Sequence, residues 1–94
     1  MLLTLLRMHN WRTLSRLGRG EEPGAESSVV KLAWTEMTQH LSSVALDVVG
    51  DGSPLWDEDG WDRQWLWSKA ASIAGGTSEV QRTIIGDRIL GLPR

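Results

Sequence analysis

Apolar residues recur every three or four positions along most of the chain, a spacing typical of amphipathic helices. The pattern predicts helices over residues 2–17, 28–49 and 61–73, and a last one that starts at Thr77 or Ser78 and stops at Gly91-Leu92-Pro93. No segment shows the strict alternation of a strand. We therefore expect an all-α protein, a bundle of about four helices.

The helix predicted over residues 28–49 carries a wide apolar stripe. Ser27 or Ser28 is expected to cap its start through a hydroxyl, and Gly50 to end it. In the last helix the spacing predicts a buried side of branched residues. The stripe of the helix over residues 28–49 consists of Val30, Ala33, Trp34, Met37, Leu41, Val44, Ala45 and Val48. The buried side of the last helix consists of Val80, Ile84, Ile85 and Ile89.

Turn-forming residues separate these segments. Gly18-Arg19-Gly20 ends the first helix, and residues 21–26 (EEPGAE) form a polar linker. Residues 51–60 (DGSPLWDEDG) are expected to be an acidic loop, and Gly75-Gly76 breaks the chain before the last helix.

Composition narrows the possible functions. The chain has 94 residues, 10 basic and 12 acidic, for a net charge of −2, so nucleic acid is not expected as its main partner. There is no Cys for a disulfide or a thiolate nucleophile, and His9 and His40 are too isolated to predict a metal site, so we assign both to structural, partly buried positions. No signal peptide or membrane span is indicated, which predicts a cytoplasmic protein without a membrane partner.

The segment Gly75-Gly76-Thr77-Ser78-Glu79 is the clearest candidate for a binding site. Two glycines allow a ligand to approach the backbone, and the following helix start offers N–H groups and two hydroxyls to an anion. On spacing alone, a Gly-Gly turn followed by an ordinary capped helix is the favoured interpretation of the segment.

Residues 72–94 (SIAGGTSEVQRTIIGDRILGLPR) resemble the C-terminal end of acyl-CoA dehydrogenases, whose flavin-proximal stretch is similar to Gly-Gly-Thr-Ser-Glu-hydrophobic-Gln-Arg and leads into a helix that ends in Leu-Gly-Leu-Pro. Residues 23–32 (PGAESSVVKL) look like the family's linker and the start of its next helix. Bacterial members that act on bulky, including steroid-derived, acyl groups look most similar. Residues 1–19 fit the preceding helix by pattern.

The resemblance implies that residues 1–94 are part of the family's C-terminal helical domain, which follows a helical and a β domain in subunits that usually form tetramers. It implies an FAD-dependent oxidoreductase of lipid metabolism and fatty acid β-oxidation. The family takes the α-hydrogen of an acyl-CoA as a proton and the β-hydrogen as a hydride, which leaves a 2-enoyl-CoA. Implied partners are the acyl-CoA substrate, other dehydrogenase subunits in a homo- or hetero-tetramer, and an electron-transfer partner.

By the same resemblance, Thr77, Ser78 and Glu79 match the triplet that lines FAD, and Gly76 matches the backbone position that touches the substrate. Gly75 stands where many members carry the catalytic Glu, so no catalytic residue is assigned. Some members carry the base on an earlier helix, and in others paired subunits divide the work. Residues 47–51 (DVVGD) stand where many members carry a Gln-containing segment that ends in Gly-Gly and reaches a neighbouring subunit's flavin.

Other side chains have a structural interpretation beside the functional one. Glu36 is a weak candidate for a relocated base and is expected at the surface. Six Trp without Phe or Tyr are unusual, and Trp61, Trp65 and Trp67 are expected to be core or interface anchors, with stacking on an adenine or flavin as the alternative.

Three hypotheses result. The leading one is the C-terminal fragment of an FAD-dependent acyl-CoA dehydrogenase, inactive alone because most of the active site is missing. The second is a stand-alone helical interaction module that associates with a dehydrogenase subunit or with itself, through the first helix and the Trp faces. The third is a small four-helix bundle with an anion site at residues 77–79.

Overall fold

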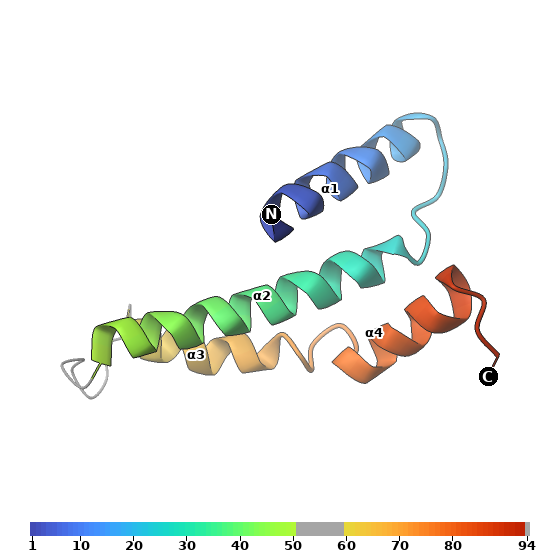
Figure 1. Cartoon of the computed structure of the whole chain (residues 1–94). Helices are drawn as coiled ribbons and strands as arrows, with labels where there is room; N and C mark the ends of the chain where they lie inside the picture. Colours follow the sequence, from blue (N-terminus) through green and yellow to red (C-terminus); the bar gives the residue numbers. More distant parts are fainter. Residues whose placement is uncertain (51–59, 94) are drawn as a thin grey trace. The chain divides into compact units, whose positions relative to one another are not determined.

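The computed structural model describes residues 1–50 and 60–93, and the regular structure within these ranges is helical, as predicted (Figure 1). The last α-helix continues into a π-helical segment. The elements are α1 (Leu2–Gly18), α2 (Glu26–Val49), α3 (Trp61–Ala70), α4 (Ser78–Ile84) and the π-helical η2 (Ile85–Ile89).

The start of α2 differs from the prediction. The helix begins at Glu26, so Ser27 and Ser28 lie inside its first turn and do not cap it. The Ser28 N–H donates to the Ala25 carbonyl at 2.9 Å. Glu26 instead places a carboxylate in the first turn, where the positive end of the helix dipole favours it.

The predicted ends of the two middle helices agree in part with the structure. Gly50 follows α2 with φ of +62°, the left-handed conformation expected of a glycine after a helix. In contrast, α3 ends at Ala70 rather than Ile73, because the chain tightens into turns in which the Ile73 and Ala74 N–H groups both donate to the Ala70 carbonyl, at 3.1 and 2.8 Å. The predicted loop over 51–60 lies outside the described residues, apart from Gly60.

The last helix widens at its end, which the sequence did not indicate. Over η2 the Leu90 N–H donates to the Ile85 carbonyl at 3.0 Å, and Gly91 then ends the helix with φ of +64°, as predicted. The predicted buried side is wrong in part, because Val80 and Ile89 are exposed while Gln81 is buried. The extra residue in a π-helical turn shifts the side chains beyond Ile84 away from the 3.6-residue period.

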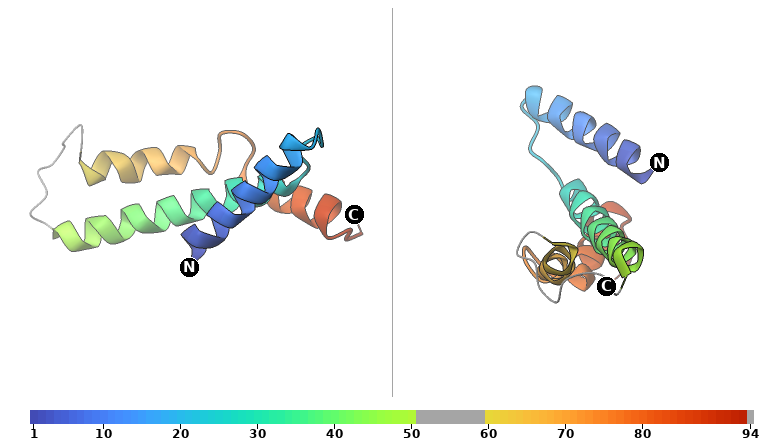
Figure 2. Two further views of the ribbon diagram at one scale, coloured as in Figure 1. Left: turned by 90° about the horizontal axis from the view of Figure 1, so that it is seen from above. Right: turned by 90° about the vertical axis from the view of Figure 1, so that its left-hand side faces the viewer.

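The chain divides into two compact units. One comprises Met1–Trp34 and Ser78–Arg94, and the other Thr35–Thr77. The second unit contains α3 and the C-terminal part of α2, which run side by side in opposite directions (Figures 1 and 2).

A row of polar groups joins the two helices of the second unit, and we call it the polar seam. The Thr35 hydroxyl donates to the Ala71 carbonyl at 3.3 Å, and the Gln39 amide donates to the Ser68 carbonyl at 3.0 Å. The Trp65 indole N–H donates to the Ser43 hydroxyl at 3.1 Å. The polar seam consists of Thr35, Gln39, Ser42 and Ser43 on α2 with Trp65, Ser68 and the Ala71 carbonyl on and after α3.

The small hydroxyl side chains at the centre of the polar seam are the most deeply buried. Ser42 is 2% exposed and Ser68 4%. The Ser42 hydroxyl lies 2.9 Å from the Thr38 carbonyl, 3.1 Å from the Gln39 carbonyl and 3.4 Å from the Ser68 hydroxyl. The helices therefore approach each other over small side chains whose polar atoms are satisfied locally.

The apolar stripe of α2, in contrast, is largely exposed over its C-terminal part. Leu41 is 57% exposed and Val48 80%, and Val44 is exposed as well. Among the described residues, Leu6 is the one large apolar side chain that is buried, at 7% exposure. The stripe does not face the helix that packs on α2, because α3 contacts the polar seam on the other side.

In the first unit, ion pairs fasten the end of α1 to the start of α2. Arg16 Nε donates to Glu21 Oε2 at 2.8 Å and Arg16 Nη1 donates to Glu26 Oε1, while Arg19 Nε donates to Glu21 Oε1 at 3.0 Å. The hydrogen bond from Arg16 lowers the pKa of Glu21 below its ordinary value. A hydrogen bond to its own backbone N–H and then the pairing with Arg16 lower the pKa of Glu26.

Candidate functional site

The predicted binding segment begins with two glycines in a left-handed backbone conformation. φ is +68° at Gly75 and +98° at Gly76, values that favour glycine because a Cβ would crowd the backbone. A Cβ built on Gly75 meets nothing within 4 Å. The backbone conformation, rather than crowding by neighbours, therefore requires glycine at residue 75.

The polar residues of the segment follow directly. Thr77 is the residue before α4, and Ser78 and Glu79 form the beginning of that helix. Thr77 and Ser78 are half-buried, whereas Glu79 is exposed. The Glu79 carbonyl accepts a hydrogen bond from the Thr83 hydroxyl at 3.0 Å. The structure thus places the predicted residues next to one another at a turn between helices.

The donor set at this turn is of the kind that a flavin requires. The isoalloxazine ring carries carbonyl oxygens and ring nitrogens, and FAD also carries phosphates, all of which accept hydrogen bonds from hydroxyl and backbone N–H groups. The bend at Gly75 and Gly76 keeps side chains out of the way of a close ligand. Gly75 offers no group that could accept a proton, so residue 75 itself cannot act as a catalytic base.

The two histidines lie in different environments. His9 on α1 is half-buried, as expected of a structural histidine, and its Nε2 is buried without a hydrogen-bond partner. His40 on α2 is exposed, so the prediction of a partly buried position is wrong there. Glu36 and Asp47 on the same helix are exposed, and Asp51 lies outside the described residues.

The tryptophans of α3 also differ. Trp65 is half-buried in the polar seam, and the Lys69 ammonium lies 4.5 Å from the centre of its ring, close enough for a cation–π contact. Trp61 and Trp67 are 45% and 74% exposed, so within this chain neither anchors a core. Their assignment as interface anchors stays a prediction.

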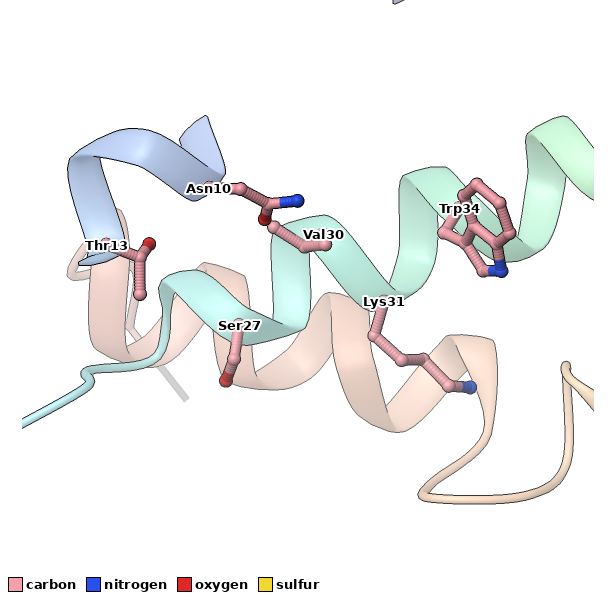
Figure 3. Close-up of a pocket in the computed structure, with 6 residues that line it drawn as sticks. All are labelled: Asn10, Thr13, Ser27, Val30, Lys31 and Trp34. Atoms are coloured by element: carbon pink, nitrogen blue, oxygen red, sulfur yellow. The ribbon is translucent and has the colours of Figure 1, made fainter. Parts of the chain in front are cut away.

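A cavity of about 270 Å³ lies between α1 and the first part of α2, within the first unit (Figure 3). Sequence reasoning did not identify it, although its α2 residues recur with helical spacing on one side of the helix. A second cavity, of about 190 Å³, borders η2 and the chain end. The larger cavity is lined by Asn10, Thr13, Ser27, Val30, Lys31 and Trp34, and the smaller by Thr83, Gly86, Asp87, Leu92 and Pro93.

Helices long and apolar enough to cross a bilayer do not occur among residues 1–50 and 60–93.

Curated proteins with similar sequences are mycobacterial. The chain is 42% identical over 77 residues to the acyl-CoA dehydrogenase IpdE1 of Mycobacterium tuberculosis, an alignment that covers 79% of this chain and 20% of the relative. The IpdE1 of Mycolicibacterium smegmatis is also 42% identical, with 79% and 19% covered. The acyl-CoA dehydrogenase FadE34 of Mycobacterium tuberculosis is 36% identical over 75 residues, with 80% and 10% covered.

The chain therefore spans at most about a fifth of the length of these relatives. No solved structure matches it. The family model described as acyl-CoA dehydrogenase, C-terminal domain, matches residues 2–90, which is nearly the whole chain. The chain belongs to the acyl-CoA dehydrogenase family, and it corresponds to the C-terminal domain.

Proposed function

We propose that this chain is the C-terminal part of an FAD-dependent acyl-CoA dehydrogenase, which converts an acyl-CoA thioester to the 2-enoyl-CoA. The observation that carries the proposal is the family match over residues 2–90, which includes the Gly-Gly-Thr-Ser-Glu segment. The left-handed backbone at Gly75 and Gly76, directly before α4, supports a binding role for that segment.

In the proposed enzyme, this segment binds and orients rather than reacts. Bound FAD supplies the hydride acceptor for the β-hydrogen of the acyl group. Thr77 and Ser78 donate hydrogen bonds to the flavin, Glu79 completes the flavin-lining triplet, and Gly76 leaves room for the acyl group beside its backbone. Held in this way, the substrate needs little reorganisation to reach the reactive geometry.

The proton acceptor for the α-hydrogen comes from outside this segment, because Gly75 has no carboxylate. We expect the 94 residues to be inactive alone, since a preorganised pocket needs the helices and the β domain that the longer relatives contain. Other dehydrogenase subunits and an electron-transfer partner complete the system, and we propose a role in fatty acid β-oxidation, on a bulky acyl group.

Flavin retention tests the proposal. In a full-length dehydrogenase that ends in this sequence, Thr77→Ala removes a hydroxyl from the proposed flavin site and should lower the FAD content of the purified enzyme several-fold. Thr83→Ala is the matched control, because the Thr83 hydroxyl is exposed and donates a hydrogen bond to the Glu79 carbonyl of its own helix. Equal FAD content in the two variants would contradict the assignment.

The exposure of the apolar side chains favours a second candidate, an interaction module that associates with a dehydrogenase subunit. Leu41, Val48 and Trp67 remain well exposed in this chain, as an interface would require. Copurification of the chain with a separately expressed flavin-containing subunit favours this function. Binding of FAD by the chain alone, seen as quenched flavin fluorescence, contradicts our view that its flavin site is incomplete.

A further inference from the structure

The larger cavity of the first unit combines apolar walls with polar groups. Val30 and Trp34 supply apolar surface, and the Trp34 side chain is 52% exposed. Asn10 extends its amide from α1 toward Val30, while Lys31 and Trp34 lie at the opposite end of the cavity from Thr13 (Figure 3). Apolar walls with a few polar groups are the usual composition of a site for a small molecule.

The hydroxyl groups at one end of the cavity already donate to backbone carbonyls. The Thr13 hydroxyl donates to the His9 carbonyl at 3.1 Å, and the Ser27 hydroxyl donates to the Gly24 carbonyl at 3.4 Å. A hydroxyl group has one hydrogen, so in this arrangement both oxygens offer a ligand an acceptor and no donor. The hydrogen-bond donors for a ligand therefore come from the other polar side chains of the cavity.

These donors are the Asn10 amide and the Lys31 ammonium group. The amide has two N–H donors and the ammonium group three, so each can bind more than one acceptor. Among the described residues that line the cavity, Lys31 alone is charged. A hydrogen bond from an ammonium group to a carboxylate is stronger than one between neutral groups. This part of the cavity therefore favours a carboxylate.

The distribution of charge between the two units favours an anion as well. The first unit carries eight of the ten basic residues of the chain but five of its twelve acidic ones. Two of those five, Glu21 and Glu26, are paired with Arg16. An excess of positive charge around a cavity raises the local concentration of anions.

The apolar walls and the size of the cavity restrict the rest of the ligand. The indole of Trp34 offers a planar apolar surface on which an aromatic ring can stack. At about 270 Å³ the cavity lies below the roughly 300–1,000 Å³ of pockets that hold drug-sized molecules. A compact aromatic ring system suits both the surface and the volume.

We propose that this cavity binds a small aromatic carboxylate, with the carboxylate group at Asn10 and Lys31 and the ring against Val30 and Trp34. An apolar side chain from another part of a longer protein could fill the same space. It would cover the Asn10 amide and the Lys31 ammonium group without adding an acceptor, which costs free energy. The site uses none of residues 75–79, so it does not depend on the proposed flavin binding.

Isothermal titration of the full chain with 2-naphthoate tests the role of charge. We expect saturable binding that is at least about five-fold tighter than that of 2-naphthamide, which has the same ring system and no charge. Lys31→Met keeps an unbranched side chain without the charge. It should abolish the preference for 2-naphthoate and leave the affinity for 2-naphthamide within about two-fold.

Lys69→Met is the matched control for this titration. Lys69 is the other lysine of the chain, and it lies in the second unit over the ring of Trp65. The preference for 2-naphthoate should survive in this variant. Absence of saturable binding, equal affinities for the two compounds in the original chain, or the same loss in both variants overturns the proposal.

Amide chemical shifts of the nitrogen-15-labelled chain locate the ligand. With 2-naphthoate the largest changes should fall on residues 10–13 and 27–34, and Trp34→Ala should remove them. Because Trp34 is half exposed, its replacement should leave the helices intact, which circular dichroism checks. Trp67→Ala is the control, since Trp67 is 74% exposed on α3 and should not affect the shifts. Largest changes on α3 or on residues 75–79 would overturn the proposal.

A full-length dehydrogenase that ends in this sequence distinguishes a small ligand from another part of the protein as the occupant. The preference for 2-naphthoate over 2-naphthamide, again removed by Lys31→Met, supports the site in the complete enzyme. No binding, or binding that Lys31→Met leaves unchanged, means that the rest of the protein fills the cavity and overturns the proposal. The FAD content should be equal with and without Lys31→Met, which separates this test from that of Thr77→Ala.

Discussion

The two sides of α2 show opposite relations between polarity and burial. On the side that packs against α3, the polar seam buries Ser42 and Thr35 to 2% exposure. On the other side Leu41, next in sequence to Ser42, is 57% exposed. Small polar residues therefore hold the hairpin of α2 and α3 together, while the larger apolar surface stays available for another surface to cover.

This difference has a physical basis. Serine and threonine hydroxyls in a helix can bond to carbonyls three or four residues earlier, so they can be buried between helices without unsatisfied groups. Their small size lets the backbones approach closely. Exposed leucine and valine side chains are unfavourable in water, and a partner that covers them gains about 25 cal/mol for each Å² of apolar surface buried. The surface is thus suited to association, while the seam is suited to folding.

Substitutions that place an apolar residue in the polar seam or a polar residue on the apolar stripe should have the largest effects on the free energy of unfolding. Ser42→Leu forces a larger side chain into a filled position and should lower the free energy of unfolding by about 2–3 kcal/mol. Leu41→Ser removes little buried surface and should cost less than about 1 kcal/mol, mainly through helix propensity. Urea denaturation at low protein concentration measures both, and a larger loss for Leu41→Ser would reverse the comparison.

A smaller loss is expected from the Gln39 amide. Gln39→Ala removes the hydrogen bond to the Ser68 carbonyl and should lower the free energy of unfolding by about 1 kcal/mol. His40→Ala is the control, because His40 is exposed on the same turn of the helix. Urea denaturation that finds equal stability for the two variants would show that the Gln39 bond does not hold the seam.

Trp65 and Trp67 allow a similar comparison of a buried and an exposed side chain within α3. Trp65→Phe removes the hydrogen bond to the Ser43 hydroxyl, with an expected loss of about 0.5–1 kcal/mol. Trp67→Phe changes a side chain that is 74% exposed and should leave stability nearly unchanged. Thermal denaturation of the two variants measures the difference, and a lower midpoint for Trp67→Phe would argue against this register of α3.

A fall in pH should have the smallest effect on stability, and it should destabilise the first unit. The polar seam contains no ionisable side chain, whereas Glu21 and Glu26 pair with Arg16. Their lowered pKa values mean that the pairing stabilises the fold above the ordinary glutamate pKa of about 4.3 and is lost as the pH falls through the lowered values.

Urea denaturation at neutral and acidic pH measures this effect. Glu26→Gln should be slightly less stable than the original chain near neutral pH and equally stable in strong acid. A difference that persists in strong acid would show that the pairing with Arg16 is not its cause.

Much of the fold could be predicted from the sequence because helical periodicity and glycine stops are local signals. The helix over residues 2–17, the stop at Gly50 and the break at Gly75 followed from such signals. The packing side of α2 did not, because apolar residues outnumber small polar ones in its pattern. Thr35, Gln39 and Ser42 recur at four and three residues, a signal equal in period to the apolar stripe but without hydrophobicity to mark it.

The candidate site was predictable in position but not in detail. Glycines before polar residues indicated a turn at the start of a helix, and the backbone at Gly75 and Gly76 agrees. The π-helical end of the last helix had no signal in the sequence. The helical spacing of the α2 residues that line the cavity beside Trp34 does not by itself indicate a cavity, because the cavity also needs Asn10 and Thr13 of α1. The flavin-lining role of Thr77 to Glu79 stays a prediction, since it depends on parts that only the longer relatives contain.

The most direct test of the account is which side of α2 touches α3. Isotope-edited nuclear Overhauser spectra of the monomeric chain report contacts from individual side chains. We predict contacts from the Gln39 amide to Ser68 and from Ser43 to the Trp65 indole N–H, with none from the Leu41 methyl groups to α3. Strong contacts between the Leu41 methyls and α3, with none from Gln39, would contradict the account.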